Sequence, residues 1–194
     1  VDVVRVKLRV LYVEGRPRWE YTYLQRRLVR SEMDVQLQCW LSDVSPGFEQ
    51  EHSRDVGPLL RLPVEADELL EAYDVVILGE AEPARMTSDP LDGARFLDGV
   101  AGFVQRGGGL LLLSGPRHNP RALVGSPLEP LLPVVIGREG APPGAAFRPV
   151  PPDPQRPHPV TMLEAEAAQN FALWINATPL QWFQPVERLR PGAA

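Results

Sequence analysis

Short apolar stretches alternate with stretches of helical period along the chain, and this alternation restricts the fold more than any other feature of the sequence. Residues 8–13, 73–78 and 110–113 are rich in Leu, Val and Ile, and each stretch ends at a turn that contains glycine. Within 18–30 and 92–106, apolar residues recur every three or four positions, which is the spacing of one helix face. Such strands alternating with amphipathic helices are typical of a parallel sheet covered on both faces. The sequence therefore predicts an open α/β sandwich with right-handed crossovers.

Four further segments complete the predicted elements. Residues 35–40 alternate apolar and polar side chains, which predicts a half-buried strand. Residues 65–72 predict a short acidic helix, 164–174 a short helix near the end of the chain, and 180–184 a strand.

The length of the chain predicts one domain over residues 1–194, because domains commonly hold about 100 to 200 residues. Residues 42–63 lack a clear period and are predicted to form a long surface loop. Residues 137–160 are predicted to form a second long loop. This segment is rich in proline, which can neither donate a hydrogen bond to a β-ladder nor sit inside a helix. The sequence starts with valine rather than methionine, so we expect this domain to be a fragment of a longer protein.

Charge and cysteine content exclude several classes of protein. The formal net charge is -5 and Lys7 is the only lysine, so the basic footprint that nucleic-acid binding needs is absent. Cys39 is the only cysteine, which excludes an internal disulfide, and its position inside a strand predicts a small buried apolar residue. No apolar run approaches the roughly 20 residues that cross a bilayer. We therefore expect no nucleic-acid partner and no direct membrane insertion by this segment.

Charged residues follow the predicted strands, where an open α/β sheet binds its ligands. Strand ends meet at one edge of a parallel sheet, so we expect a ligand or partner rim there. Its candidate residues are Glu14, Arg16, Arg18, Glu80, Glu82, Arg117 and His118. Arg16 and Arg18 precede a helix and are candidates for holding an anion or a partner carboxylate. The alternative is that these charged residues simply occupy solvated loops.

Ser114 and His118 are the candidate catalytic residues. A nucleophile elbow places serine between small residues after a strand, as in G-x-S-x-G, but here the glycine two positions before Ser114 is missing. Pro116 removes one backbone N–H that an oxyanion hole would use. Catalytic bases normally come from elsewhere in the chain rather than from four residues on. No residue is therefore assigned a catalytic role.

Metal and cofactor motifs are not found. His52, His118 and His158 share no ligand spacing, so a metal would have to be bound by distant loops together with Glu80 and Glu82. Residues 107–109 are three glycines that follow a predicted helix, whereas a phosphate loop precedes one, so we interpret them as a helix C-cap. We predict no metal and no cofactor.

Aromatic residues gather in two places, at Trp19, Tyr21 and Tyr23 and again at Trp174, Trp182 and Phe183. Aromatics at this density usually belong to the core. Any subset that is exposed would instead mark a partner surface.

Several stretches carry a family resemblance. They are LYVEGRPRWEY at 11–21, YDVVILG at 73–79, GGGLLLLSGP at 107–116, PHPVT at 157–161 and WFQPV at 182–186. Together they resemble a class I glutamine amidotransferase-like domain, in the version found in large bacterial membrane proteins that also carry a von Willebrand factor A-type domain. The resemblance touches nearly the whole chain. It implies a flavodoxin-like three-layer sandwich with a mostly parallel sheet.

The resemblance implies the scaffold of this family and not its amidotransferase reaction. Active members hydrolyse glutamine with a cysteine at the elbow and a later histidine and glutamate. The matching elbow here is Ser114 and Gly115, and His158 is followed by Pro159 and Val160 instead of a His-x-Glu pattern. A thiolate nucleophile and its base have no replacement at these positions.

The leading hypothesis is a non-catalytic module of a membrane-anchored bacterial protein that serves binding or assembly. Its partners would be other domains of the parent protein or neighbouring subunits of a membrane complex. The alternative is a hydrolase or amidotransferase-type enzyme with altered chemistry at Ser114 or at a Glu/His site at the strand ends. Nucleotide or flavin binding at the strand ends is a third hypothesis, although the chain has no G-x-G-x-x-G motif.

Overall fold

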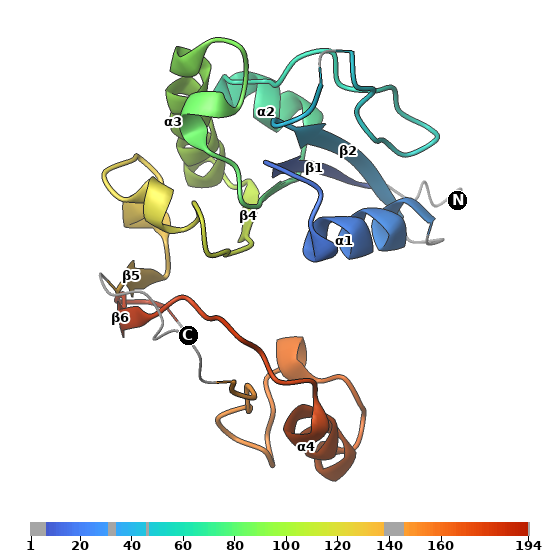
Figure 1. Cartoon of the computed structure of the whole chain (residues 1–194), viewed down its shortest axis with the longest axis vertical. Helices are drawn as coiled ribbons and strands as arrows, with labels where there is room; N and C mark the ends of the chain where they lie inside the picture. Colours follow the sequence, from blue (N-terminus) through green and yellow to red (C-terminus); the bar gives the residue numbers. More distant parts are fainter. Residues whose placement is uncertain (1–6, 31–33, 46, 138–145, 194) are drawn as a thin grey trace, which may run out of the picture. The chain divides into compact units, whose positions relative to one another are not determined.

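The structure, a computed structural model, describes residues 7–30, 34–45, 47–137 and 146–193 (Figure 1). Contacts divide the chain into two compact units. The first unit holds Val1–Ile136 together with Val186–Ala194, and the second holds Gly137–Pro185. Each unit is described by itself below. One domain over 1–194 stays a prediction, because two contact-rich units can belong to one domain.

A four-stranded parallel sheet forms the centre of the first unit. Its strands are β1 (Leu8–Glu14), β2 (Val35–Leu41), β3 (Val75–Leu78) and β4 (Gly109–Leu112), and they lie in the order β2-β1-β3-β4. All neighbouring pairs are parallel. The predicted parallel α/β fold is therefore confirmed.

Three helices connect these strands: α1 (Trp19–Arg30), α2 (Ala66–Ala72) and α3 (Pro90–Gln105). The side chain of Asp89 accepts a hydrogen bond from the backbone N–H of Leu91 at 2.9 Å and so caps the start of α3. Gly107 follows the end of α3 with a φ of 104°, a conformation that favours glycine. The predicted helices and the glycine C-cap are confirmed.

Successive residues of β1 belong to two different hydrophobic clusters, because strand side chains point alternately to opposite faces. Val10 and Tyr12 pack in one cluster with Tyr21 of α1. Leu11 and Val13 pack in the other, which contains residues of α2 and α3. The central position of β1 in the sheet therefore buries both of its faces.

The two outer strands, β2 and β4, differ in what covers their free edges. Beside β2, residues of the 42–63 segment form hydrogen bonds along the free edge: the backbone N–H of Cys39 donates to the carbonyl of Glu51 at 2.8 Å, and Ser53 N–H donates to Leu37 at 2.8 Å. β4 pairs with β3 alone within the described sheet, and its Leu111 is 45% exposed. The strand predicted at 110–113 is present, but its predicted burial is wrong: Leu111 is exposed and the other three leucines are only partly buried, because an outer strand packs against fewer neighbours.

The first unit also contains β5 (Val134–Ile136) and β6 (Val186–Leu189), which form an antiparallel pair. The sequence indicates neither strand. They are three and four residues long and come together from opposite ends of the 137–185 segment. Strands this short, paired over such a separation, have no periodic signal of their own.

The second unit contains α4 (Ala167–Asn176) and irregular backbone. Asn170 is fully buried, and its side-chain oxygen accepts from the N–H of Leu163 at 2.7 Å. The rings of Phe147 and Phe183 meet edge to face with centroids 5.0 Å apart. The strand predicted at 180–184 is reduced to one isolated bridge between Leu180 and Phe147.

The predicted loop 137–160 is described only in part, because residues 138–145 lie outside the described residues. From residue 146 onward it contains a single bridge residue, bends and the beginning of a short 3₁₀ helix, Pro159–Thr161. In the 42–63 segment the described residues form no helix, and His52 forms one isolated bridge to Gln38.

Candidate binding site

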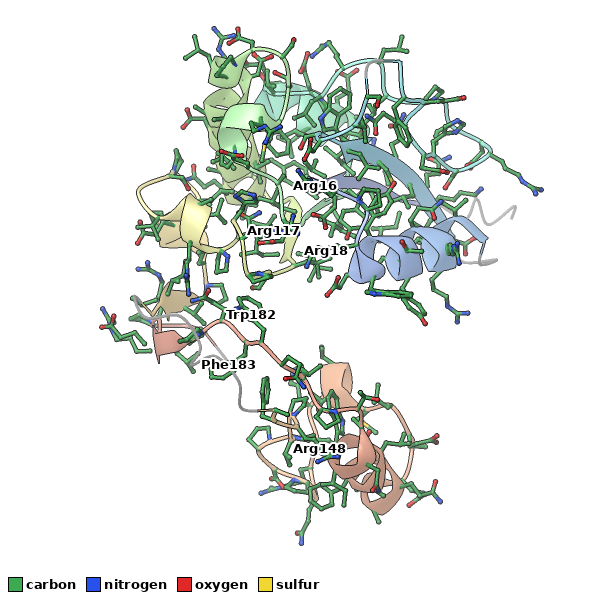
Figure 2. The ribbon with its side chains drawn as sticks, in the orientation of Figure 1. Arg16, Arg18, Arg117, Arg148, Trp182 and Phe183 are labelled. Carbon is green, nitrogen blue, oxygen red and sulfur yellow. The ribbon has the colours of Figure 1, made fainter. Side chains whose placement is uncertain are left out.

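The carboxyl ends of β1, β3 and β4 meet at one edge of the sheet, and a cleft of about 330 Å³ opens there. Because the strands are parallel, the residues that follow each of them are brought together. The cleft is lined by Glu14, Arg16, Pro17, Arg18, Glu20, Glu80, Pro116, Arg117 and His118. Figure 2 shows Arg16, Arg18 and Arg117 near the start of α1 and the end of β4. Six of the seven predicted rim residues therefore line one cleft.

Glu82 is the predicted rim residue that does not line this cleft. Its carboxylate lies 3.9 Å from the guanidinium of Arg85 on the next turn. The chain turns into a short 3₁₀ helix at Pro83, which carries Glu82 away from the strand ends.

Glu14 ends β1, and its carboxylate is fully buried. One oxygen, Oε1, accepts from the backbone N–H groups of Gly15 at 3.0 Å and Glu80 at 2.7 Å. The other oxygen, Oε2, accepts from Nε of Arg18 at 2.9 Å. A buried carboxylate is tolerated only when it is paired and hydrogen-bonded, and Glu14 meets both conditions.

Arg18 joins three elements at the floor of the cleft. Besides Glu14, its guanidinium donates to the backbone carbonyls of Ser114 at 3.2 Å and Leu113 at 3.3 Å. Burial lowers the pKa of Arg18, but the hydrogen bond and charge of Glu14 outweigh this effect and raise it overall. The hydrogen bonds of Arg18 therefore connect the start of α1 to the ends of β1 and β4.

Glu80 is the second buried carboxylate of the cleft, with 8% of its surface exposed. Its Oε1 accepts three backbone N–H groups of one turn: Arg117 at 3.1 Å, His118 at 2.8 Å and Asn119 at 3.1 Å. Successive backbone N–H groups that converge in this way form an anion-binding nest. In this chain the anion in the nest is the chain's own side chain.

Glycines make room for the two carboxylates. A Cβ at Gly79 would lie 2.2 Å from Glu14 Oε2, and a Cβ at Gly115 would lie 2.2 Å from Cγ of Glu80. A Cβ at Gly15 would come within 2.4 Å of the carbonyl oxygen of Glu80. The prediction of the site missed these three glycines. The sequence signal that could have found two of them is a glycine next to a glutamate, Glu14-Gly15 at the end of β1 and Gly79-Glu80 at the end of β3.

Two of the remaining cations of the cleft differ in their partners. Arg16 forms an ion pair with Asp43, and this hydrogen bond is the main reason why the pKa of Asp43 is lowered. The Arg117 guanidinium is exposed and forms no hydrogen bond or ion pair with any residue that the structure describes, although its charge adds slightly to the lowering of the pKa of Asp43. The His118 ring is half-buried in the cleft lining. The exposed, unpaired charge of the cleft is therefore positive.

Ser114 is exposed on the turn after β4. Within the described backbone, positive φ angles occur only at Gly47, Gly107, Gly125 and Gly192. Neither Ser114 nor Gly115 thus has the left-handed bend of a nucleophile elbow. No hydrogen bond between the Ser114 hydroxyl and His118 is found in the described part of the chain.

A larger cavity, of about 720 Å³, is lined by residues 40–45, 47–50, 58–60, 84–88 and 90. Its charged lining residues are Asp43, Glu49 and Arg85, and Asp43 and Arg85 lie 3.5 Å apart. Leu41, Ser42 and Asp43 at the end of β2 line this cavity, but the residues that end β1, β3 and β4 do not. We therefore place the candidate site at the smaller cleft, where convergent charged groups and parallel strand ends coincide.

No family model, curated protein or solved structure matches this chain. Among the residues that the structure describes, no group of three or more His, Cys, Asp or Glu side chains is placed to hold a metal ion.

Proposed function

We propose that this chain is a non-catalytic binding module with a flavodoxin-like, glutamine amidotransferase-like scaffold. The parallel order β2-β1-β3-β4 supports this scaffold. The two clusters on opposite sides of β1 support its three-layer form, with α1 in one outer layer and α2 and α3 in the other.

The cleft would hold an anionic group, such as a carboxylate of a partner. The observation that carries this proposal is the unpaired guanidinium of Arg117 in a cleft whose two buried carboxylates are already satisfied. Arg16 lines the same cleft. It would add a second positive charge if its guanidinium left Asp43 and paired with the ligand instead. Planar guanidinium groups bind carboxylates through paired hydrogen bonds.

The occupied nest at residues 117–119 supports a binding role over a catalytic one. Backbone N–H groups of this kind stabilise an oxyanion in acyl-transfer enzymes, but here they bind Glu80. An oxyanion of a substrate would have to displace a buried carboxylate that accepts several hydrogen bonds. The cleft is therefore better suited to hold a stable anion than to stabilise a transient one.

The setting that we propose is a membrane-anchored bacterial protein, with other domains of the parent protein or neighbouring subunits as partners. This part of the proposal rests on the resemblance of the sequence stretches described above. No helix in the described residues has the length and apolar character needed to span a membrane.

Titration of the intact chain with succinate, followed by NMR shifts or calorimetry, tests the proposed function. We expect weak, saturable succinate binding that Arg117→Ala weakens about tenfold or more, the usual loss for a key charged contact. The matched control is Arg121→Ala, because Arg121 is also exposed but lies outside the cleft lining. Absence of binding by the unaltered chain, or an equal loss in both variants, would contradict the proposal. Ammonia release from glutamine that Ser114→Ala abolishes would contradict its non-catalytic part.

A further inference from the structure

The solvent-facing side of α1 carries an aromatic pair followed by arginines. Trp19 is 77% exposed and Tyr23 is 70% exposed, and their ring centroids lie 6.3 Å apart. Arg26 and Arg27 follow on the same helix and are exposed. At 3.6 residues per turn, these four positions fall within an arc of about 100° and extend over about 12 Å. We call this set, Trp19, Tyr23, Arg26 and Arg27, the α1 face.

The opposite side of α1 is the side that packs in the core. Tyr21 is buried against the sheet, and Leu24 and Leu28 pack against the same cluster. The fold is therefore stabilised by the inward side of the helix. Large exposed aromatic side chains on the other side contribute little to the core. Two such rings side by side are typical of a surface that binds a partner.

The arginines of the α1 face have no partner among the described residues. Arg18, at the start of the same helix, binds Glu14, whereas no hydrogen bond or ion pair of Arg26 or Arg27 is found within the described ranges. Trp, Tyr and Arg are the residues most enriched in the energetic centres of protein interfaces. The α1 face has this composition together with a local positive charge on a chain of net charge -5.

We propose that the α1 face docks an acidic segment of a partner polypeptide that also carries an apolar side chain. Carboxylates of the segment would pair with Arg26 and Arg27, and the apolar side chain would pack on the rings of Trp19 and Tyr23. Charge complementarity selects this occupant, because surface charges act over about 8 Å at physiological salt and the α1 face is locally cationic. None of the four residues of the α1 face lines the strand-end cleft, although Trp19 lies between Arg18 and Glu20, which do.

A membrane surface is a poorer occupant of the α1 face. Helices that lie in a bilayer interface bury a broad apolar side in it, but the apolar side chains of α1 pack in the core. Only the two rings of Trp19 and Tyr23 are left for lipid. A nucleic acid needs a more extended basic surface than two arginines.

The test uses the intact chain and a short fluorescent peptide in which glutamates flank leucine and phenylalanine. We expect saturable binding that weakens as ionic strength rises from about 0.05 to about 0.3 M. The double variant Arg26→Glu/Arg27→Glu and the double variant Trp19→Ala/Tyr23→Ala should each lose about tenfold or more in affinity. Because all four side chains are exposed, circular dichroism should show that both variants keep the fold.

Matched controls make the outcome specific. Arg54→Glu/Arg121→Glu reverses two other exposed arginines that lie outside both the α1 face and the cleft lining, and it should leave peptide binding unchanged. Equal loss in the Arg54/Arg121 variant would show a nonspecific charge effect and overturn the proposal. Binding to anionic phospholipid vesicles but not to the peptide would overturn it in favour of a membrane. Concentration-dependent self-association that the Arg26/Arg27 variant abolishes would overturn it in favour of a second copy of the chain.

Discussion

The two buried glutamates decide what the strand-end cleft can do. Glu14 and Glu80 are each held by several hydrogen bonds, Glu14 with the help of Arg18 and Glu80 by backbone N–H groups alone. Carboxylates satisfied in this way act as structural parts. The residue that is left to act on a ligand is Arg117.

Replacement of Glu80 by alanine tests the nest of residues 117–119 directly. We expect Glu80→Ala to lower the free energy of unfolding by about 2 kcal/mol, because several backbone donors lose their acceptor. Formate should then restore part of the stability of this variant by occupying the empty nest, as any ligand that binds only the folded state does. Urea unfolding with and without formate measures both effects. Glu82→Ala is the control, since Glu82 lies outside the cleft, and equal formate responses in the two variants would refute the nest.

At the scale of elements, the interface between α1 and the sheet concentrates buried ionisable groups. Burial raises the pKa of Tyr12 and Tyr21, and it raises the pKa of the Cys39 thiol to about 12. All three belong to one hydrophobic cluster. This interface therefore tolerates the neutral forms of its side chains and disfavours the charged ones.

The resulting prediction is alkaline unfolding that begins at this interface. The pKa of each group is higher in the folded state, so the stabilisation is complete below the unfolded pKa, near 9 for Cys39 and 10 for the tyrosines, and is lost as pH rises toward the folded values. One pH unit above the unfolded pKa, each buried tyrosine should lower the free energy of unfolding by about 1.4 kcal/mol.

Tyr21→Phe should move this alkaline loss of stability to higher pH while changing the stability at neutral pH by less than about 1 kcal/mol. The exposed ring of Tyr23 on the same helix provides the control, Tyr23→Phe. Denaturant unfolding between about pH 7 and 11 provides the measurement. Identical pH profiles for the Tyr21 variant and the unaltered chain would show that burial at this interface does not govern the response.

At the scale of the whole molecule, the second unit is inserted between two paired strands of the first. Ile136 of β5 pairs with Val186 of β6, and the N–H of Gly137 donates to the carbonyl of Pro185 at 2.9 Å. Both ends of the inserted segment are therefore close together. Segments whose ends meet are commonly tolerated as domain insertions.

Joining Ile136 to Val186 through an Asn-Gly turn should leave the first unit folded. Two residues suffice to connect antiparallel neighbours, and the buried core of the sheet lies entirely within the retained residues. We expect the shortened chain to unfold cooperatively in urea. Tryptophan fluorescence measures this unfolding, because the shortened chain keeps Trp40 in β2. Gradual, non-cooperative unfolding would show that the first unit depends on Gly137–Pro185.

Local patterns account for the parts of the fold that were predicted. The apolar runs around Val75–Leu78 and the three- and four-residue spacing within Pro90–Gln105 fix strand and helix without knowledge of their neighbours. The β5–β6 pair was missed because it joins distant segments. The exposure of Leu111 was missed because a sequence does not say which strand lies at the edge of a sheet.

The sequence by itself determined that this chain forms a parallel α/β sheet and that charged residues gather at its strand ends, because hydrophobic periodicity and the turns that follow each strand depend on residues that are close together in the chain. Only the tertiary structure decided which charges remain available there. Arg18 was predicted as a ligand residue but is taken by Glu14, and Glu80 is taken by the backbone of residues 117–119. The physical reason is that hydrogen-bond partners are chosen by distances of about 3 Å, and those distances exist only once separate strands have come together.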